Sequence, residues 1–178
     1  MTTKKILVTG GAGFIGSHLT DHLLAIGYQV TVIDNLVNGN LNNLSEAKKN
    51  QNFTFVHGDI LDKQLCIDVA KDCAFIFHLA CLGVRHSIHS PFENHRVNAE
   101  GTLNVLEAAK QNNIEHFFYI STSEIYGRTT SFPITEEAAT APLTVYGASK
   151  LVGEHYTNAY NECYQLNTTV LRIFNNYG

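Results

Sequence analysis

The hydrophobic residues of this chain fall into short continuous runs that alternate with stretches of helical periodicity. Six runs have strand length: Lys5–Thr9, Gln29–Asp34, Phe53–His57, Ala74–Leu79, His116–Ser121 and Thr168–Phe174. Their apolar residues are continuous rather than alternating, as expected for strands that are covered on both faces. Strands and helices in alternation predict an α/β fold with a doubly wound parallel sheet.

Three segments show helical features. In the first, apolar residues recur from Ile15 to Ile26, and Gly27 closes the segment. The second begins at Ser90, where Pro91 and Glu93 predict an N-cap with a capping box, and its apolar positions continue to Ala109. The third runs from about Thr144 to Tyr164.

Composition narrows the class of protein. A length of 178 residues, with 44% hydrophobic and 16% charged residues, predicts one globular domain over residues 1–178. The net charge of −4 provides no basic field for nucleic acid and no polybasic membrane patch. The four cysteines form no CxxC pair, and the N-terminus has no signal-peptide pattern, so we expect a reduced, cytoplasmic protein.

The sequence VTGGAGFIG, residues 8–16, places glycines where the first strand should turn into a helix. Gly10 would permit a tight turn, Gly13 would let backbone amides approach a diphosphate, and Gly16 would let the helix pack closely on the sheet. The free amides and the positive end of the helix dipole would hold the phosphate charge. This spacing predicts a dinucleotide site.

Asp34 ends the second strand, eighteen residues after Gly16, where its carboxylate can accept hydrogen bonds from both hydroxyls of an adenosine ribose. Residues 35–47 contain no lysine or arginine that could offset a 2′-phosphate. The predicted cofactor is therefore NAD rather than NADP.

Tyr146 and Lys150 are spaced i, i+4 on the third predicted helix and share one face. Lowering a tyrosine pKa from near 10 by about three units requires roughly 4 kcal/mol. One ammonium about 4 Å away, in an effective dielectric near 20, supplies about that much. Lys150 is thus a suitable partner for a tyrosine base. Thr122 or Ser123, after the fifth strand, can donate a hydrogen bond to the substrate oxygen from which Tyr146 would take a proton.

In this order, the segments TGGAGFIG, GDI, HLA, STSEIYG, YGASK and RIFNNYG resemble the extended short-chain dehydrogenase/reductase family. The nearest group is the nucleotide-sugar epimerases and dehydratases, and the resemblance covers essentially the whole chain. It implies a Rossmann-like NAD-binding domain that carries the catalytic residues, with most of the C-terminal substrate-binding region missing. It also implies a UDP- or dTDP-linked sugar substrate and, by analogy, a possible homodimer.

The resemblance assigns roles residue by residue. Its catalytic positions fall on Tyr146, Lys150, Thr122, Ser123 and Glu124, and its substrate contacts on Asn175, Arg85 and Ser123. Its cofactor contacts fall on Gly10, Gly13, Phe14, Ile15, Gly16, Asp34, Asn35, Asp59, Ile60, Leu79, Ala80, Asn98, Tyr146 and Lys150. His78 belongs to the segment beneath the cofactor, and Cys81 stands where this group often has a second alanine.

The implied reaction starts when Tyr146 takes the C4 hydroxyl proton while hydride moves from C4 to NAD⁺. An epimerase then returns hydride to the other face, a dehydratase removes water across C5 and C6, and a decarboxylase releases CO₂ from a 4-keto uronic acid. Glu124 resembles the dehydratase and decarboxylase branches, or is a solvated strand-end carboxylate. Residues 82–93 instead resemble epimerases that act on UDP-uronic acids.

Other possibilities stay open at this point. One alternative is a NAD-binding module without catalysis. Another is an alcohol dehydrogenase that releases NADH. We expect the functional polypeptide to extend beyond Gly178. The pairs His18/His22 and His86/His89 have no third ligand at a recognisable spacing, so no metal site is predicted.

Overall fold

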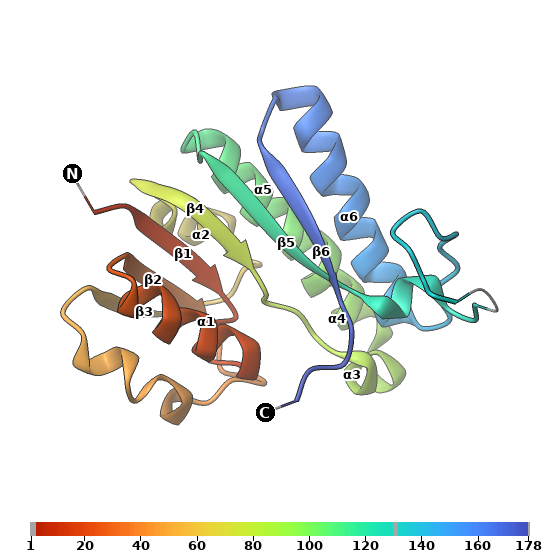
Figure 1. The fold of residues 1–178 in the computed structure, drawn as a ribbon, viewed down its shortest axis with the longest axis horizontal. Coiled ribbons are helices and arrows are strands. Elements are labelled where there is room, and N and C mark those ends of the chain that lie inside the picture. The colour runs from red at the N-terminus through yellow and green to blue at the C-terminus, as the bar shows by residue number, and fades with distance from the viewer. Residues whose placement is uncertain (1–2, 130–131, 178) are drawn as a thin grey trace.

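The computed structural model describes residues 3–129 and 132–177. Within them, one parallel sheet contains β1 (Lys5–Thr9), β2 (Gln29–Asp34), β3 (Phe53–His57), β4 (Cys73–His78), β5 (His116–Thr122) and β6 (Thr168–Ile173). Their spatial order is β3-β2-β1-β4-β5-β6 (Figure 1). The prediction of six parallel strands is confirmed. Three of them are shifted slightly: β4 lies one residue earlier, β5 ends one residue later and β6 ends one residue earlier.

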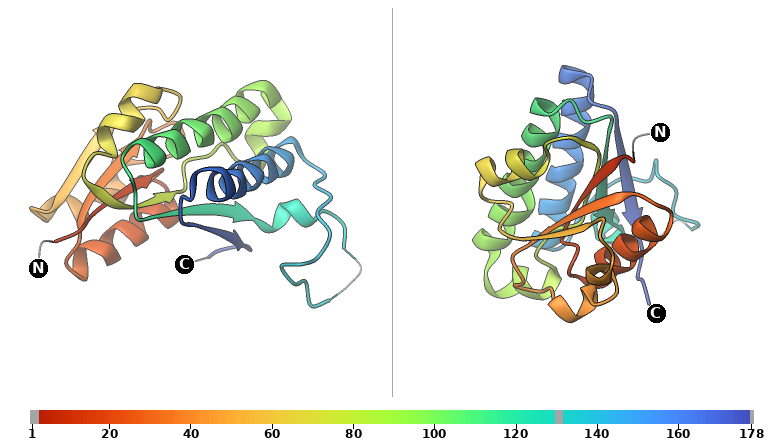
Figure 2. Two further views of the ribbon diagram at one scale, coloured as in Figure 1. Left: turned by 90° about the horizontal axis from the view of Figure 1, so that it is seen from above. Right: turned by 90° about the vertical axis from the view of Figure 1, so that its left-hand side faces the viewer.

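Helices lie on both faces of the sheet. They are α1 (Phe14–Ala25), α2 (Lys63–Val69), α3 (Val84–His89), α4 (Pro91–His95), α5 (Thr102–Gln111) and α6 (Val145–Tyr164). One face is covered by α2, α5 and α6, and the other by α1 with the short 3₁₀ turns Leu41–Leu44 and Ala47–Lys49 (Figure 2). The chain is therefore doubly wound, as the sequence predicted.

Alternate residues of β1 supply the two halves of the core. Leu7 packs in the cluster that contains Val105 and Leu106 of α5, whereas its neighbour Val8 packs in the cluster that contains Leu23 and Leu24 of α1. Because successive side chains of a strand point to opposite faces, a strand covered on both sides must be apolar throughout. This explains the continuous hydrophobic runs.

The second predicted helix differs from expectation. Ser90 precedes α4, but its side chain makes no capping hydrogen bond. The Glu93 carboxylate instead contacts the His86 ring of α3, with 2.8 Å between Oε2 and Nε2, so the capping box is wrong. The helix is also not α-helical throughout, because a π-helical turn over Arg96–Gly101 separates α4 from α5. Helices α2 and α3 were not predicted, since six or seven residues are too few to establish a helical period.

Candidate functional site

A cavity of about 500 Å³ lies at the carboxyl ends of the strands. Its walls come from the glycine turn after β1, from Asp34, from residues 79–84 after β4, from residues 121–124, from Tyr146 and from residues 173–176. Most of these segments follow directly on a strand. Ligands in doubly wound sheets bind at this edge, so the cavity is the candidate site.

The glycine turn has the geometry that the sequence predicted. Gly10 has φ +70°, and a Cβ atom there would lie 2.7 Å from the backbone nitrogen of Ala80. A Cβ atom on Gly16 would lie 2.7 Å from Cα of Gly11. Side chains at these positions would separate β1 from α1 or from the chain after β4. Gly13, Phe14 and Ile15 line the cavity, so the start of α1 faces a bound ligand.

Backbone amides orient the carboxylate of Asp34. Its Oδ2 accepts a hydrogen bond of 2.9 Å from the Ala12 amide, and its Oδ1 accepts one of 2.8 Å from the Leu36 amide. The residue is 8% exposed and lines the cavity, so each oxygen keeps a second lone pair for a ligand. Gly39, which sequence reasoning missed, leaves this space open, because a Cβ atom there would lie 2.8 Å from Asp34 Oδ1.

Of the predicted cofactor contacts Asn35, Asp59 and Ile60, only two line the cavity. Asn35 and Ile60 line the cavity, whereas Asp59 is not among the lining residues in the described part of the chain. Asp59 Oδ2 accepts a hydrogen bond of 2.9 Å from the Asn35 side chain, and Oδ1 accepts one of 2.8 Å from the Leu61 amide. Asp59 thus orients Asn35, and its contact with a cofactor stays a prediction.

Tyr146 reaches the cavity from the first turn of α6. Thr144 caps this helix by accepting a hydrogen bond of 2.9 Å from the Gly147 amide. Burial raises the pKa of Tyr146 and a negative charge on Cys81 raises it further, while Lys150 and a hydrogen bond from the Thr122 hydroxyl lower it in part. The expected lowering of the Tyr146 pKa is therefore not achieved by the protein groups alone. Of the two predicted hydroxyl donors, Thr122 is the one whose side chain lowers the pKa of Tyr146.

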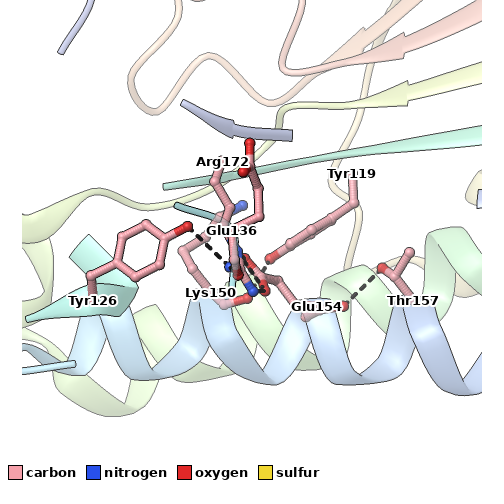
Figure 3. Close-up of polar contacts among 8 residues, drawn as sticks. Tyr119, Tyr126, Glu136, Lys150, Glu154, Thr157 and Arg172 are labelled. Atoms are coloured by element: carbon pink, nitrogen blue, oxygen red, sulfur yellow. Dashed lines mark hydrogen bonds and ion pairs between the residues drawn. The ribbon is translucent and has the colours of Figure 1, made fainter. Parts of the chain in front are cut away.

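Lys150 lies beneath Tyr146, inside the protein. It is 2% exposed, and its Nζ is 4.2 Å from the centroid of the Tyr119 ring. The Tyr119 hydroxyl in turn donates a hydrogen bond of 3.1 Å to the Lys150 backbone carbonyl (Figure 3). Burial lowers the pKa of the ammonium, but negative charge on Tyr119, Cys81 and Tyr146 raises it by more, so the net shift is upward. The site thus keeps a buried cation next to its tyrosine.

Arg172 of β6 holds three neighbouring elements together (Figure 3). Its Nε and Nη2 donate to the Glu154 carboxylate of α6 over 3.1 and 2.8 Å. Its Nη1 donates to the Tyr126 hydroxyl over 3.0 Å and to the Glu136 carbonyl over 2.7 Å. This guanidinium fixes the turn after Glu124 and the start of the C-terminal cavity wall. Sequence reasoning missed it, because its partners are far away along the chain.

His78 ends β4 in a hydrogen-bonded chain behind the cavity. Its Nδ1 is 2.7 Å from the Thr9 hydroxyl, and its Nε2 is 3.0 Å from the Thr102 hydroxyl. Thr102 donates to the Asn98 carbonyl, so the tautomer with hydrogen on Nε2 satisfies every group. Complete burial, with a smaller effect of Lys150, lowers the pKa of His78 to about 3. His78 is thus a neutral structural link.

Asn98 occupies the π-helical turn and is 1% exposed. Its amide nitrogen donates to the Leu82 carbonyl over 2.9 Å and to the Ser149 hydroxyl over 3.0 Å, while its oxygen accepts from the Leu82 amide over 2.8 Å. It therefore ties the cavity wall at Leu82 to α6. Asn98 is not among the cavity-lining residues described, and a direct cofactor contact stays a prediction.

The remaining predicted residues differ in placement. Ser123, Glu124 and Asn175 line the cavity, and Glu124 is exposed at its wall. Arg85 is exposed on α3 and is not among the lining residues of the described chain. Ser121, which sequence reasoning missed, lines the cavity although it is 2% exposed, and its hydroxyl has no hydrogen-bond partner.

Among residues 3–129 and 132–177, no group of three or more histidine, cysteine, aspartate or glutamate side chains is placed to hold a metal ion. No helix of the same residues combines the length and apolarity that a membrane span requires.

Comparisons with known proteins agree with this geometry. The family model for GDP-mannose 4,6 dehydratase matches residues 7–178. A putative UDP-glucose 4-epimerase of Methanocaldococcus jannaschii is 40% identical over 176 residues, which is 97% of this chain and 56% of that protein. A dTDP-glucose 4,6-dehydratase of Streptomyces niveus is 40% identical over 182 residues, which is 98% of this chain and 54% of that protein.

Solved structures give the same result. A UDP-N-acetylglucosamine 4-epimerase from Methanobrevibacter ruminantium superposes with a TM-score of 0.94 at 36% identity, covering 100% of this chain and 57% of that one. A dTDP-glucose 4,6-dehydratase from Streptomyces venezuelae with NAD bound has a TM-score of 0.94 at 36% identity, covering 98% and 56%. The chain spans about half the length of the relatives it matches.

Proposed function

This chain belongs to the GDP-mannose 4,6 dehydratase family, within the extended short-chain dehydrogenases/reductases, and we propose on that premise that it binds NAD and oxidises a nucleotide sugar at C4. The observation that carries the proposal is that Tyr146 and Thr122 line one cavity with the buried Lys150 close to Tyr146, where Thr122 and Lys150 both act to lower the pKa of Tyr146. These are the groups that a proton transfer from a sugar hydroxyl requires.

The cavity residues fit a dinucleotide. The glycine turn and the start of α1 present backbone amides to a diphosphate, and Asp34 presents an oriented carboxylate to the adenosine ribose. The free lone pairs of the Asp34 carboxylate can accept hydrogen bonds from ribose hydroxyls. Residues 35–47 contain no lysine or arginine to offset a 2′-phosphate, so the site favours NAD over NADP. Bound NAD would supply the hydride acceptor for C4 and a positive charge beside Tyr146.

The protein groups handle the proton. Tyr146 would accept the proton of the C4 hydroxyl, and the Lys150 ammonium would stabilise the phenolate through the low-dielectric interior. The Thr122 hydroxyl, which lines the same cavity as Tyr146, would orient the sugar oxygen. Burial alone opposes the phenolate, so the base forms only when additional positive charge is near it.

The finer activity we propose is a UDP-sugar 4-epimerase. In support, residues 82–93 resemble epimerases that act on UDP-uronic acids. The relatives favour neither branch, because epimerases and dehydratases both occur among them at 40% and 37% identity. A 4,6-dehydratase is the second candidate, favoured by the exposed carboxylate of Glu124 at the cavity wall, where it could act at C5. A UDP-glucuronate decarboxylase uses the same oxidation; one such relative is 36% identical.

The test uses the native polypeptide that carries these residues. It is incubated with NAD and with UDP-glucose, UDP-glucuronate, UDP-N-acetylglucosamine or dTDP-glucose, and products are followed by mass and proton NMR. A product of unchanged mass with inverted C4 is expected. Loss of water or of CO₂ would replace the epimerase by the dehydratase or the decarboxylase. NAD binding without turnover of any of these sugars would favour a non-catalytic module, and accumulation of free NADH a dehydrogenase.

A further inference from the structure

The short helix α4 turns a polar side chain, Asn94, into the protein. Asn94 is 0% exposed, whereas its neighbours Phe92 and Glu93 are exposed at the surface. A buried amide is costly unless its polar atoms have hydrogen-bond partners. Both the nitrogen and the oxygen of the Asn94 side chain have such partners. What Asn94 does for the protein therefore depends on the groups that it joins.

The amide nitrogen of Asn94 holds two carbonyls of the cavity wall. Its Nδ2 donates to the Leu82 carbonyl over 2.8 Å and to the Gly83 carbonyl over 3.3 Å. Leu82 and Gly83 both line the cavity, in the segment between β4 and α3. The Leu82 oxygen accepts a second hydrogen bond from Asn98, so both of its lone pairs are used. Asn94 and Asn98 together fix the orientation of this stretch of the wall.

The amide oxygen of Asn94 connects the same wall to α6. Its Oδ1 accepts from Asn98 over 3.3 Å and lies 3.2 Å from the Ser149 hydroxyl. That hydroxyl also lies 2.8 Å from the Tyr146 carbonyl, so its single hydrogen faces both acceptors. Ser149 directly precedes the buried Lys150. One connected group of side chains thus joins the cavity wall to the part of α6 that carries Tyr146 and Lys150.

This group lies at the Tyr146 end of the cavity. Strand β2 ends at Asp34 and strand β5 ends at Thr122, and β1 and β4 lie between these two strands. At a strand spacing of about 4.8 Å, β2 and β5 are separated by roughly 14 Å. Asn94 is bonded to α6, which packs against β5. A change at Asn94 should therefore reach Tyr146 and leave the Asp34 end of the cavity in place.

We propose that Asn94 is a positioning residue for the reaction at Tyr146, because it locks residues 82–83 of the cavity wall and the start of α6 into one unit. The inference rests on the proposed function, in which Tyr146 takes the proton of the sugar hydroxyl. Without the Asn94 amide, two carbonyls of the wall lose a donor and the wall can move relative to α6. A displacement of about 1 Å between a substrate and its base can cost roughly 10²-fold in rate.

Steady-state kinetics test the proposal in the native polypeptide. UDP-glucose is the probe substrate or, if it is not turned over, whichever of UDP-glucuronate, UDP-N-acetylglucosamine and dTDP-glucose is. Asn94→Leu keeps the approximate volume of the side chain and removes its hydrogen bonds. We expect it to lower kcat by about tenfold or more. The NAD affinity and its ratio to the NADP affinity, measured by titration, should each change by less than about threefold.

Asn112→Leu is the matched control. The Asn112 side chain also donates to two carbonyls, those of Ile67 over 3.1 Å and Ala108 over 2.9 Å. Neither of these residues is among those that line the cavity in the described part of the chain. We expect this variant to be less stable in urea and to keep its kcat. Equal kcat values in Asn94→Leu and Asn112→Leu would overturn the inference, and so would a loss of NAD affinity as large as the loss of kcat.

A partial replacement guards against loss of the fold. Asn94→Thr keeps one donor and one acceptor at this position, so its kcat should lie between those of the unaltered protein and Asn94→Leu. If Asn94→Leu does not fold, Asn94→Thr is compared with Asn112→Leu by the same criteria. A kcat in Asn94→Thr no lower than that of Asn112→Leu would then refute the positioning role.

Hydrogen exchange separates this inference from the proposed function. Peptides that cover residues 80–86 and 144–150 are followed by mass, without added ligand. We expect the Asn94 variants to speed exchange by about tenfold in both peptides, and Asn112→Leu to leave both unchanged. Faster exchange in neither peptide, or in only one of them, refutes the coupling of the wall to α6. An unaltered protein that turns over none of the four sugars refutes the proposed function, and exchange then still decides whether Asn94 couples the two segments.

Discussion

Arg172 and Glu154 form an ion pair that is almost closed to solvent, with their side chains 21% and 4% exposed. Nε and Nη2 of the guanidinium both donate to the carboxylate, which is the two-bond arrangement that arginine favours. The pair joins β6 to α6, and Arg172 extends the contact to Tyr126. Two segments of the cavity wall therefore depend on one guanidinium.

Removing one partner of this pair should be costly. We expect Arg172→Met to lower the free energy of unfolding by about 3 kcal/mol, because it leaves the Glu154 carboxylate buried and unpaired. Urea unfolding measures the change. The double variant Arg172→Met with Glu154→Met should recover part of the loss. Lys49→Met, at an exposed pair with Glu46, is the matched control and should change stability by less than about 0.5 kcal/mol.

Removal of the Tyr146 hydroxyl should separate binding from chemistry. We expect Tyr146→Phe to lower turnover of the nucleotide sugar by about 10²–10⁴-fold, the usual contribution of a general base. NAD affinity should change only a few-fold, because the ring still lines the cavity. Tyr156→Phe, on the same helix, is the control. Unaltered turnover in Tyr146→Phe would remove this residue from the proposed mechanism.

The Asp34 charge should decide between the two dinucleotides. We expect the protein to bind NAD more tightly than NADP. Asp34→Asn should lower the ratio of NAD affinity to NADP affinity by about tenfold or more, because the charge repulsion with a 2′-phosphate is lost. The amide oxygen can still accept one backbone hydrogen bond, which favours retention of the fold. Fluorescence titration with both nucleotides gives the ratio. Asp68→Asn, at an exposed carboxylate, should leave it unchanged.

His78 should make stability depend on pH. Burial holds its pKa at about 3 in the folded protein, below the ordinary value of 6.5, so the unfolded chain binds one more proton between these values. Stability is therefore full above pH 6.5 and falls as the pH falls toward 3. By linkage we expect a loss of about 2 kcal/mol between pH 7 and pH 5.

Urea unfolding at several pH values checks this slope. His78→Gln should flatten the dependence between pH 7 and 5, whatever its stability at pH 7. His155→Gln, at an exposed position of α6, should retain the dependence. An unaltered slope in His78→Gln would assign the effect to other groups.

Local sequence patterns predicted much of the fold. The apolar runs identified all the strands described, within one residue at their ends, because strands covered on both faces are apolar along most of their length. The spacing of Gly10, Gly13 and Gly16 predicted a turn whose close approaches the structure confirms. The capping box at Ser90 failed because Glu93 found a better-placed partner in His86, a competitor that local reasoning does not see.

The sequence by itself determined the strands, the glycine turn, the acidic end of β2 and the face shared by Tyr146 and Lys150. Each of these follows from spacing along one segment. The tertiary structure decided which hydroxyl lowers the pKa of Tyr146, and that burial raises this pKa by more. It also decided that Asn98 and Arg172 bind the cavity wall to α6. These facts depend on groups that are distant in the chain and on the water that packing removes, and no local period encodes either.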